Sequence, residues 1–88
     1  MLESKIEKQC VNWAKDNGWL SFKFVSPCNR GVPDRMFLKQ GKTVFVEFKQ
    51  PGGKISTLQR RQIERLRAWD FKVFIIDSLE GFKIAFTR

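Results

Sequence analysis

The sequence has no histidine and only two cysteines, and these absences exclude several kinds of chemistry. Two isolated cysteines without histidine do not make the usual structural zinc site, and a disulfide between them is not expected in a reducing compartment. We expect Cys10 to fill space in the core and Cys28 to be a loop thiol. Because the commonest general base is missing, any catalysis must use carboxylates, lysine or a bound metal ion.

Long apolar segments are also lacking. No run approaches the roughly 20 apolar residues that a membrane helix needs. Met1 leads directly into charged, helix-like sequence, so no signal peptide is expected. We therefore expect no membrane association and a cytoplasmic location.

Acidic residues are scarce relative to basic ones. Nine Asp and Glu stand against seventeen Lys and Arg, which gives a formal net charge of +8 in 88 residues. A bias of this size favours a polyanionic partner, and nucleic acid is the first choice. A merely soluble basic surface is the alternative that charge alone leaves open.

The apolar content is sufficient for one small domain, expected to span residues 1–88. A chain of this length buries only about 60% of the surface that it exposes when unfolded, so its core must be compact. Apolar residues make up 42% of the chain, with nine Phe and three Trp. That is too apolar and too aromatic for a disordered tail.

Hydrophobic periodicity and turn residues predict the element order α-β-β-β-α-β-β. The expected elements are a helix over residues 2–17, strands over 19–25, 34–40 and 43–49, a helix over 56–69, and strands over 72–77 and 82–87. Ser56, with Gln59 three residues on, predicts a capping box for the second helix. The order implies an α/β fold with a mixed β-sheet, in which the strand over 72–77 lies parallel to a hairpin strand.

The strand over 43–49 carries the most informative residues. Alternation puts Val44, Val46 and Phe48 on one face, and Phe45, Glu47 and Lys49 on the other. Apolar residues on both faces indicate a central strand, covered on both sides. Since a buried unpaired charge is costly, Glu47 and Lys49 each need a partner. The plain alternative is an ordinary Glu–Lys pair at a fraying strand end.

The hairpin turn determines whether a second carboxylate joins this pair. With Gly41 at the first position of a type II′ turn, Gln40 would stand opposite Thr43 and Asp34 opposite Lys49. Asp34 would then lie on the same face as Glu47 and diagonal to it, within reach of convergent side chains. A loop one residue longer would send Asp34 to the other face.

Two converging carboxylates and an amine would suit metal-assisted chemistry. Oxygen ligands favour Mg²⁺ or Mn²⁺, and Mg²⁺ is usually held by one or two carboxylates together with waters and phosphate oxygens. Such an ion could polarise a phosphodiester and activate water. Lys49 could orient that water or offset charge on phosphorus. The set is sufficient for phosphodiester hydrolysis, and it lies in a basic protein.

These residues resemble a known nuclease family. Pro33-Asp34, twelve residues, and then Glu47-Phe48-Lys49 look like the PD-(D/E)XK signature. The chain is more specifically similar to the VRR-NUC family, and also to archaeal Holliday-junction resolvases. The matching segments are Ser26-Pro27, Arg30 to Arg35, Val46 to Lys49, Pro51-Gly52-Gly53 and Leu58-Gln59. The resemblance implies a restriction-endonuclease-like core.

The resemblance also implies roles for individual residues. Asp34, Glu47 and the backbone carbonyl of Phe48 would be metal ligands, and Lys49 the catalytic lysine. A carboxylate on the first helix would also serve the site. Glu7 matches the resolvase-like spacing, while Glu3, one turn earlier, is its rival, and a solvated helix face is the alternative for both.

Further candidates surround this centre. Gln59 matches a family glutamine on the second helix, although its capping-box role is a strong alternative. It shares a helix face with Gln62, and two polar side chains there favour a nearby polar site. Ser26 would contact phosphate or water, or be an ordinary loop serine. The basic residues expected to grip phosphates, unless they only face solvent, are Arg30, Arg35, Lys54, Arg60 and Arg61.

Together these features predict a Mg²⁺- or Mn²⁺-dependent DNA endonuclease, for which the family implies products with 5′-phosphate and 3′-hydroxyl ends. Chains this short look like stand-alone members from phage genomes, which places the protein in a bacterial or phage-infected host cell. A homodimer would suit a symmetric branched substrate such as a four-way junction, with Trp19, Phe71 or Phe82 as its apolar surface. The alternatives are a non-catalytic nucleic-acid-binding module and a nuclease subunit that needs a partner.

Overall fold

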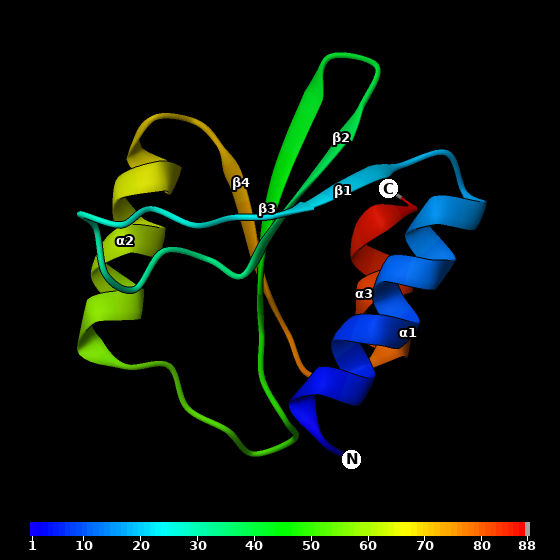
Figure 1. Ribbon diagram of the computed structural model, residues 1–88, viewed down its shortest axis with the longest axis horizontal. Coiled ribbons are helices and arrows are strands. Elements are labelled where there is room, and N and C mark those ends of the chain that lie inside the picture. Colours follow the sequence, from blue (N-terminus) through cyan, green and yellow to red (C-terminus); the bar gives the residue numbers. More distant parts are fainter. Residues whose placement is uncertain (88) are drawn as a thin grey trace.

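The computed structural model describes residues 1–87, which form an α/β fold with the element order α-β-β-β-α-β-α (Figure 1). The elements are α1 (Glu3–Asp16), β1 (Leu20–Lys23), β2 (Arg35–Lys39), β3 (Lys42–Phe48), α2 (Thr57–Ala68), β4 (Lys72–Ile76) and α3 (Leu79–Phe86). The first six lie within the ranges predicted from the sequence, apart from Lys42 at the start of β3.

The four strands form one mixed sheet in the order β1-β2-β3-β4. β1 pairs antiparallel with β2, and β2 with β3, while β3 and β4 are parallel. The predicted mixed sheet and its parallel crossover are therefore confirmed. β3 is central, and its last five residues, 44–48, are all buried.

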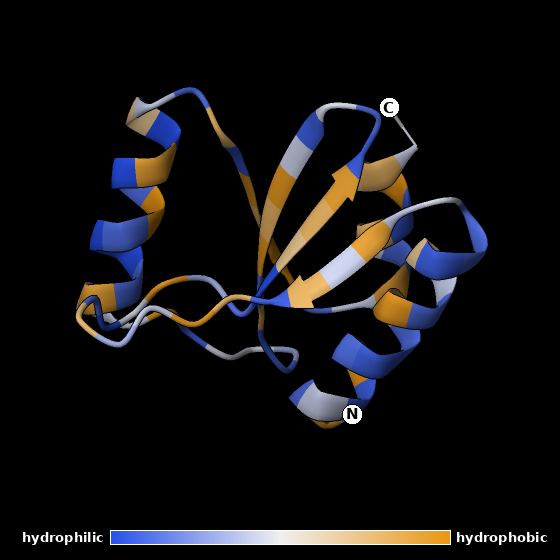
Figure 2. Cartoon of the chain, turned by 45° about the horizontal axis from the view of Figure 1, so that its top comes forward, coloured by the Kyte–Doolittle hydropathy of each residue, from blue (hydrophilic) through white to orange (hydrophobic). Residues whose placement is uncertain are grey.

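Helices cover both faces of the sheet, with α1 and α3 on one side and α2 on the other (Figure 1). The larger core lies between the sheet and the α1–α3 pair, and includes Ile6, Phe37, Val46 and Phe82. The smaller core, under α2, is built on Phe45, Ile63 and Val73. Figure 2 shows the same division, with hydrophobic colour along the strands and alternating bands on the helices.

The hairpin prediction was wrong in turn type and register, but right about the face. Gln40 and Gly41 are the turn residues, with φ of 49° and 81°, which is a type I′ pattern rather than the expected II′. Lys39 pairs with Lys42, and Arg35 with Val46. The same register extended by one position puts Asp34 opposite Glu47, not Lys49. Since residues directly opposite share a face, Asp34 and Glu47 stay together.

The predicted final strand over residues 82–87 is also wrong, because this segment is the helix α3. Ser78 caps it, its hydroxyl accepting a 3.0 Å hydrogen bond from the N–H of Gly81. Phe82 and Phe86 are buried and stacked with ring centroids 4.0 Å apart, while Ile84 is 57% exposed. A helix buries two aromatic rings on the sheet here, whereas a strand would have placed Phe82, Ile84 and Phe86 on one face.

Burial also corrects one of the apolar surfaces suggested for a dimer. Phe82 is fully buried and cannot contribute, whereas Phe71 is 42% exposed and Trp19 is half-buried. Cys10 is buried and Cys28 exposed, as predicted, and burial raises the pKa of the Cys10 thiol to about 12. Within residues 1–87, none of the helices has the length and apolar content that a membrane span would require.

Candidate active site

Glu47 is the only charged residue buried in the core of the described chain. It lies near the C-terminal end of β3, and only 1% of its surface is exposed. The strand period turns its side chain to the α2 side of the sheet, away from Val46 and Phe48. A buried carboxylate is costly unless it is paired and hydrogen-bonded.

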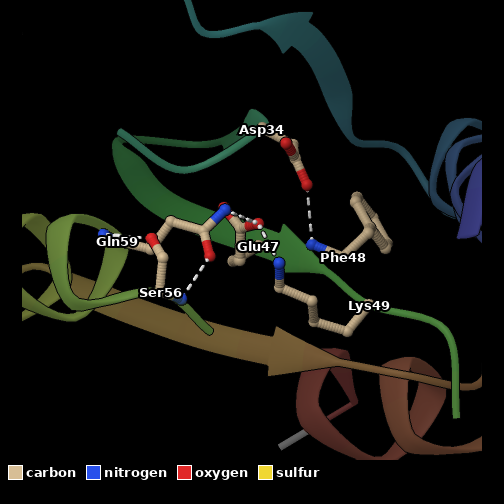
Figure 3. Close-up of polar contacts among 6 residues, drawn as sticks. All are labelled: Asp34, Glu47, Phe48, Lys49, Ser56 and Gln59. Carbon is tan, nitrogen blue, oxygen red and sulfur yellow. Dashed lines mark hydrogen bonds and ion pairs between the residues drawn. The ribbon is translucent and has the colours of Figure 1, made fainter. Parts of the chain in front are cut away.

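One oxygen of Glu47 is satisfied and the other is not. Oε2 accepts a 3.0 Å hydrogen bond from Gln59 Nε2 and lies 3.6 Å from Lys49 Nζ. Lys49 follows the last residue of β3 and folds back so that its amine approaches the carboxylate (Figure 3). The buried Oε1 atom has no hydrogen-bond partner among residues 1–87. Such an atom is a ready position for a cation.

Asp34 approaches from the neighbouring strand. It directly precedes β2, and its Oδ2 accepts a 2.8 Å hydrogen bond from the backbone N–H of Phe48 (Figure 3). Its own carbonyl accepts from the N–H of Phe24, which ties the residue to the end of β1. Asp34 is thus fixed beside the end of β3, in register with Glu47.

The two carboxylates influence each other. Burial, and secondarily the nearby Asp34 charge, raise the pKa of Glu47 to about 7, against the lowering effect of Lys49. Burial also raises the pKa of Asp34, while the Phe48 N–H opposes that shift. Carboxyls whose pKa is raised by burial, beside an amine, are typical of functional sites, because the raised pKa does not stabilise the fold at neutral pH.

The backbone of Phe48 presents a third oxygen to this space. In a strand, the N–H and C=O of one residue point to the same side. The N–H of Phe48 points toward Asp34, whereas the next N–H, of Lys49, bonds across to Ile76 on β4. The Phe48 carbonyl therefore points to the same side of β3 as its N–H, the side on which Asp34 lies just before β2 begins.

Gln59 joins the start of α2 to the site. The predicted capping box is present: Ser56 accepts from the Gln59 N–H, and Gln59 Oε1 accepts from the Ser56 N–H at 2.9 Å. The remaining end of the same amide is the group that holds Glu47. The predicted cap is therefore confirmed, and the same side chain also contacts Glu47, as its predicted site role would require.

The loop over residues 26–33 packs against the first turn of α2. Gly31 has a φ of +84°, and a Cβ there would lie 2.7 Å from the backbone of Leu58. Gln62 Nε2 donates to the Arg30 carbonyl at 3.2 Å, so it supports the loop rather than Glu47. Ser26 accepts from Asn29 Nδ2 at 2.9 Å and shapes the turn. The sequence indicated a loop with a glycine at position 31, but not that this loop packs closely against α2.

The helix carboxylates are placed differently. Glu7 accepts a 2.6 Å hydrogen bond from Arg35 Nε, and Arg35 also donates to Ser21 at 3.2 Å. This network joins α1, β1 and β2, and it was missed because no local pattern pairs residues 28 positions apart. The charge of Glu7 and, less strongly, that of Glu3 raise the pKa of Asp34, and Glu3 also raises the pKa of Glu47.

The other predicted phosphate-binding residues lie around the site on the surface. Their side chains are exposed, and none forms an ion pair among the described residues. They are Arg30 in the loop, Lys54 before α2, and Arg60 and Arg61 in its first two turns. Arg35 differs from these four, since its side chain is only 17% exposed and bound to Glu7.

The chemistry of the donors suits a hard cation bound by few protein ligands. Within residues 1–87, no group of three or more His, Cys, Asp or Glu side chains is arranged to hold a metal ion. A site here would therefore use two carboxylates and the Phe48 carbonyl. Mg²⁺ and Mn²⁺ accept such an all-oxygen set, with water and phosphate oxygens completing the coordination.

Comparisons with known proteins identify the family of this chain. Residues 2–79 match the model of the VRR-NUC domain. A protein named "Putative nuclease p44", from Acyrthosiphon pisum secondary endosymbiont phage 1, is 46% identical over 77 residues, covering 86% of this chain and 83% of its own length. A solved structure titled "VRR_NUC domain" superposes with a TM-score of 0.89 at 26% identity, over 98% of this chain and 95% of that one. A second, "VRR_NUC domain protein", shares the fold with a TM-score of 0.78 at 14% identity, over 97% and 85%.

Proposed function

The chain belongs to the VRR-NUC nuclease family, and we propose that it is a metal-dependent DNA endonuclease that hydrolyses phosphodiester bonds with Mg²⁺ or Mn²⁺. The observation that carries the proposal is Glu47, buried in the core with its Oε1 atom unpartnered among the described residues. A purely structural Glu–Lys pair would not be expected to leave one buried carboxylate oxygen without a donor among the described residues. We take residues 1–88 as one nuclease domain.

Asp34, Glu47 and the Phe48 carbonyl are the proposed metal ligands. A divalent ion held there would polarise the phosphodiester and lower the pKa of a coordinated water. The ionised carboxylates are the forms that bind the ion. Gln59 holds Glu47 in place through its 3.0 Å hydrogen bond to Oε2, which leaves Oε1 to bind the ion.

Lys49 is the proposed catalytic amine. Its Nζ lies 3.6 Å from Glu47 Oε2 and its side chain is 15% exposed, so it can reach both the carboxylate and a bound phosphate. A fixed cation at this position would stabilise the negative charge that grows on the phosphoryl oxygens. It would also orient the attacking water. The expected products carry 5′-phosphate and 3′-hydroxyl ends.

On the first helix, Glu3 is a better candidate than Glu7 for the additional carboxylate. Glu7 is held by Arg35, which also removes Arg35 from the set of free phosphate-binding residues. Glu3 raises the pKa of both Asp34 and Glu47, so it lies close enough to share their field.

The proposed substrate is branched DNA, including four-way junctions, and the proposed active species is a homodimer. The exposed basic residues Arg30, Lys54, Arg60 and Arg61 would contact phosphates near the cut. For the dimer surface, edge strand β1 offers Leu20 and Phe22, which are 61% and 52% exposed. If Leu20→Glu stays as large as wild type in analytical ultracentrifugation, β1 is not the interface.

A cleavage panel tests the function. The purified chain is incubated with single-stranded, duplex, flap and four-way-junction DNA in Mg²⁺, Mn²⁺ or EDTA. We expect metal-dependent nicks, at least about 100-fold slower in Lys49→Ala and unchanged in Lys83→Ala, which removes an exposed lysine of α3. Cleavage that persists in EDTA, or is equal in Lys49→Ala, would contradict the proposal. Tight DNA binding without cleavage in either metal would favour a binding module, and cleavage only with an added protein would favour a subunit.

A further inference from the structure

A hollow lies at the opposite end of the sheet from Glu47. Its volume is about 620 Å³, within the range of small-molecule sites. Its lining includes Gln40 and Lys42 of the β2–β3 turn, and Figure 1 shows this turn at the opposite end of β3 from the strand's last residue. From Lys42 to Glu47 the strand rises roughly 17 Å at about 3.4 Å per residue. The two sites are also on opposite faces of the sheet, since Val44 lines the hollow and Glu47 faces α2.

The floor of the hollow is aromatic. Trp19 packs edge-on against Phe86 with ring centroids 5.0 Å apart, and Phe74 lies 5.9 Å from Phe86. Trp19 and Phe74 are only partly buried, so their rings form a surface that a ligand can reach. Lys39 covers one side of Trp19, with its Nζ 5.6 Å from the ring centre and 2.9 Å from the Asn17 carbonyl.

The rim of the hollow is basic. Lys39 pairs with Lys42 across the hairpin, and Lys72 stands opposite Val44 on β4. Because Lys42 is two residues before Val44, all three lysines share one face of the sheet. Lys42 and Lys72 are exposed and form no ion pair within residues 1–87. Asp70 is the one acidic residue that lines the hollow.

We propose that this hollow binds a phosphorylated nucleotide, with its base on the Trp19–Phe86–Phe74 floor and its phosphate between Lys42 and Lys72. An aromatic floor favours a planar base of any sequence by stacking. Two unpaired ammonium groups favour the phosphate, for which lysine serves as a point charge. The aromatic floor alone, or the two lysines alone, would not select a nucleotide, but the two together in one hollow would.

The nucleotide can be free or can be an unpaired residue of a DNA strand. Both sources present the same chemistry, a base and a phosphate, so the experiment must include ligands that distinguish them. Indole N–H signals of the full chain are followed by NMR in EDTA, without any cleavage. The ligands are deoxyadenosine monophosphate, deoxyadenosine, inorganic phosphate, and duplex DNA with or without a short single-stranded overhang.

We expect the monophosphate to shift the indole signal of Trp19 and leave that of Trp69, which is exposed elsewhere on the surface. The monophosphate should bind more tightly than deoxyadenosine or phosphate alone. Lys42→Ala combined with Lys72→Ala should lower the affinity for the monophosphate by about tenfold or more, which is 1.4 kcal/mol. The matched control Lys15→Ala with Lys83→Ala removes the same charge from exposed positions outside the hollow and should bind normally.

A site for strand ends would instead show tighter binding of the overhang duplex than of the blunt one, and the same loss in the Lys42/Lys72 double variant. Either source supports the proposal. It is overturned if none of these ligands shifts Trp19, or if both double variants weaken binding equally. Because no metal or cleavage is involved, Asp34→Ala should bind like wild type, so failure here is distinct from failure of the nuclease proposal.

Discussion

Gln59 and Glu47 are joined by a 3.0 Å hydrogen bond from Nε2 to Oε2, and the other end of the same amide accepts from the Ser56 N–H. An amide can do both because it carries a donor and an acceptor on one planar group. The first turn of α2 and the buried carboxylate are therefore positioned by a single side chain. A glutamate at this position could cap the helix but could not donate to Glu47.

Gln59→Glu separates these two roles. The new carboxylate still accepts from Ser56, as in the common capping box, so α2 should remain intact by circular dichroism. The lost donor and added negative charge beside Glu47 should slow metal-dependent cleavage by about tenfold or more, since hydrogen bonds to charged groups contribute roughly 1.5–3 kcal/mol. Gln9→Glu, which makes the same change on α1, is the control and should cleave normally. A wild-type rate for Gln59→Glu would show that Glu47 does not depend on this contact.

The sequence predicted Gln59 as a site residue but could not predict its contact, and the reason is general. Spacing and alternation are local, so they placed Glu47 and Phe48 on opposite faces of β3. They also placed the capping box of α2. Pairings between distant segments depend on three-dimensional packing. The Glu7–Arg35 pair, across 28 positions, is the clearest example, and it changes which helix carboxylate can serve the site.

Neutralising Glu3 and neutralising Glu7 should have different effects on thermal stability and on Mn²⁺ binding. Glu7→Gln breaks the partly buried pair with Arg35, so it should lower thermal stability, because Arg35 is left without its partner. Glu3→Gln should not destabilise the chain, since it removes a negative charge that raises the pKa of Asp34 and Glu47. Melting curves and Mn²⁺ titration calorimetry measure both effects.

In the calorimetry, we expect weaker Mn²⁺ binding in Glu3→Gln and near-normal binding in Glu7→Gln. Glu64→Gln, at an exposed position of α2, is the control for a simple change of net charge. The reverse pattern, with Glu7→Gln losing the metal, would return Glu7 to the site.

Gly31 fixes the loop of residues 26–33 against α2, and two matched variants test this. Gly31→Ala places a Cβ 2.7 Å from the Leu58 backbone at a φ of +84°. Gly52→Ala has almost the same φ, +82°, but nothing within 4 Å. The Gly52 variant should lose about 1 kcal/mol from backbone strain alone. The Gly31 variant should lose clearly more, about 2 kcal/mol or above, because backbone atoms must also shift. Urea unfolding measures both, and equal losses would mean that the loop can move off the helix without penalty.

The hairpin and α3 show where turn and strand patterns mislead. Gly41 was assigned to the first turn position, but Gln40 takes it with a φ of 49°, a conformation that only a few non-glycine residues adopt. In the last segment, Phe82, Ile84 and Phe86 alternate like a strand. Leu79, Phe82 and Phe86 also follow helical spacing, and Ser78 was an available N-cap. A short apolar segment satisfies both periods, and packing against the sheet decides between them.

Burial of Glu47 gives the metal-free protein a defined pH dependence. The pKa of Glu47 is raised from 4.5 to about 7 in the folded chain, so the folded state binds its proton more tightly than the unfolded state. The free energy of unfolding should therefore fall as the pH rises from about 4.5 to 7. The full shift corresponds to roughly 3 kcal/mol.

Glu47→Gln cannot ionise, and in EDTA it should gain stability relative to wild type between pH 5 and pH 8. Urea unfolding at the two pH values measures the difference, with Glu64→Gln as the control. Adding Mn²⁺ at pH 8 should stabilise wild type and leave Glu47→Gln nearly unchanged, because the carboxylate that binds the ion is absent. A stability difference between wild type and Glu47→Gln that does not vary with pH would mean that Glu47 is not desolvated in solution, and the argument for a cation beside its Oε1 atom would fail with it.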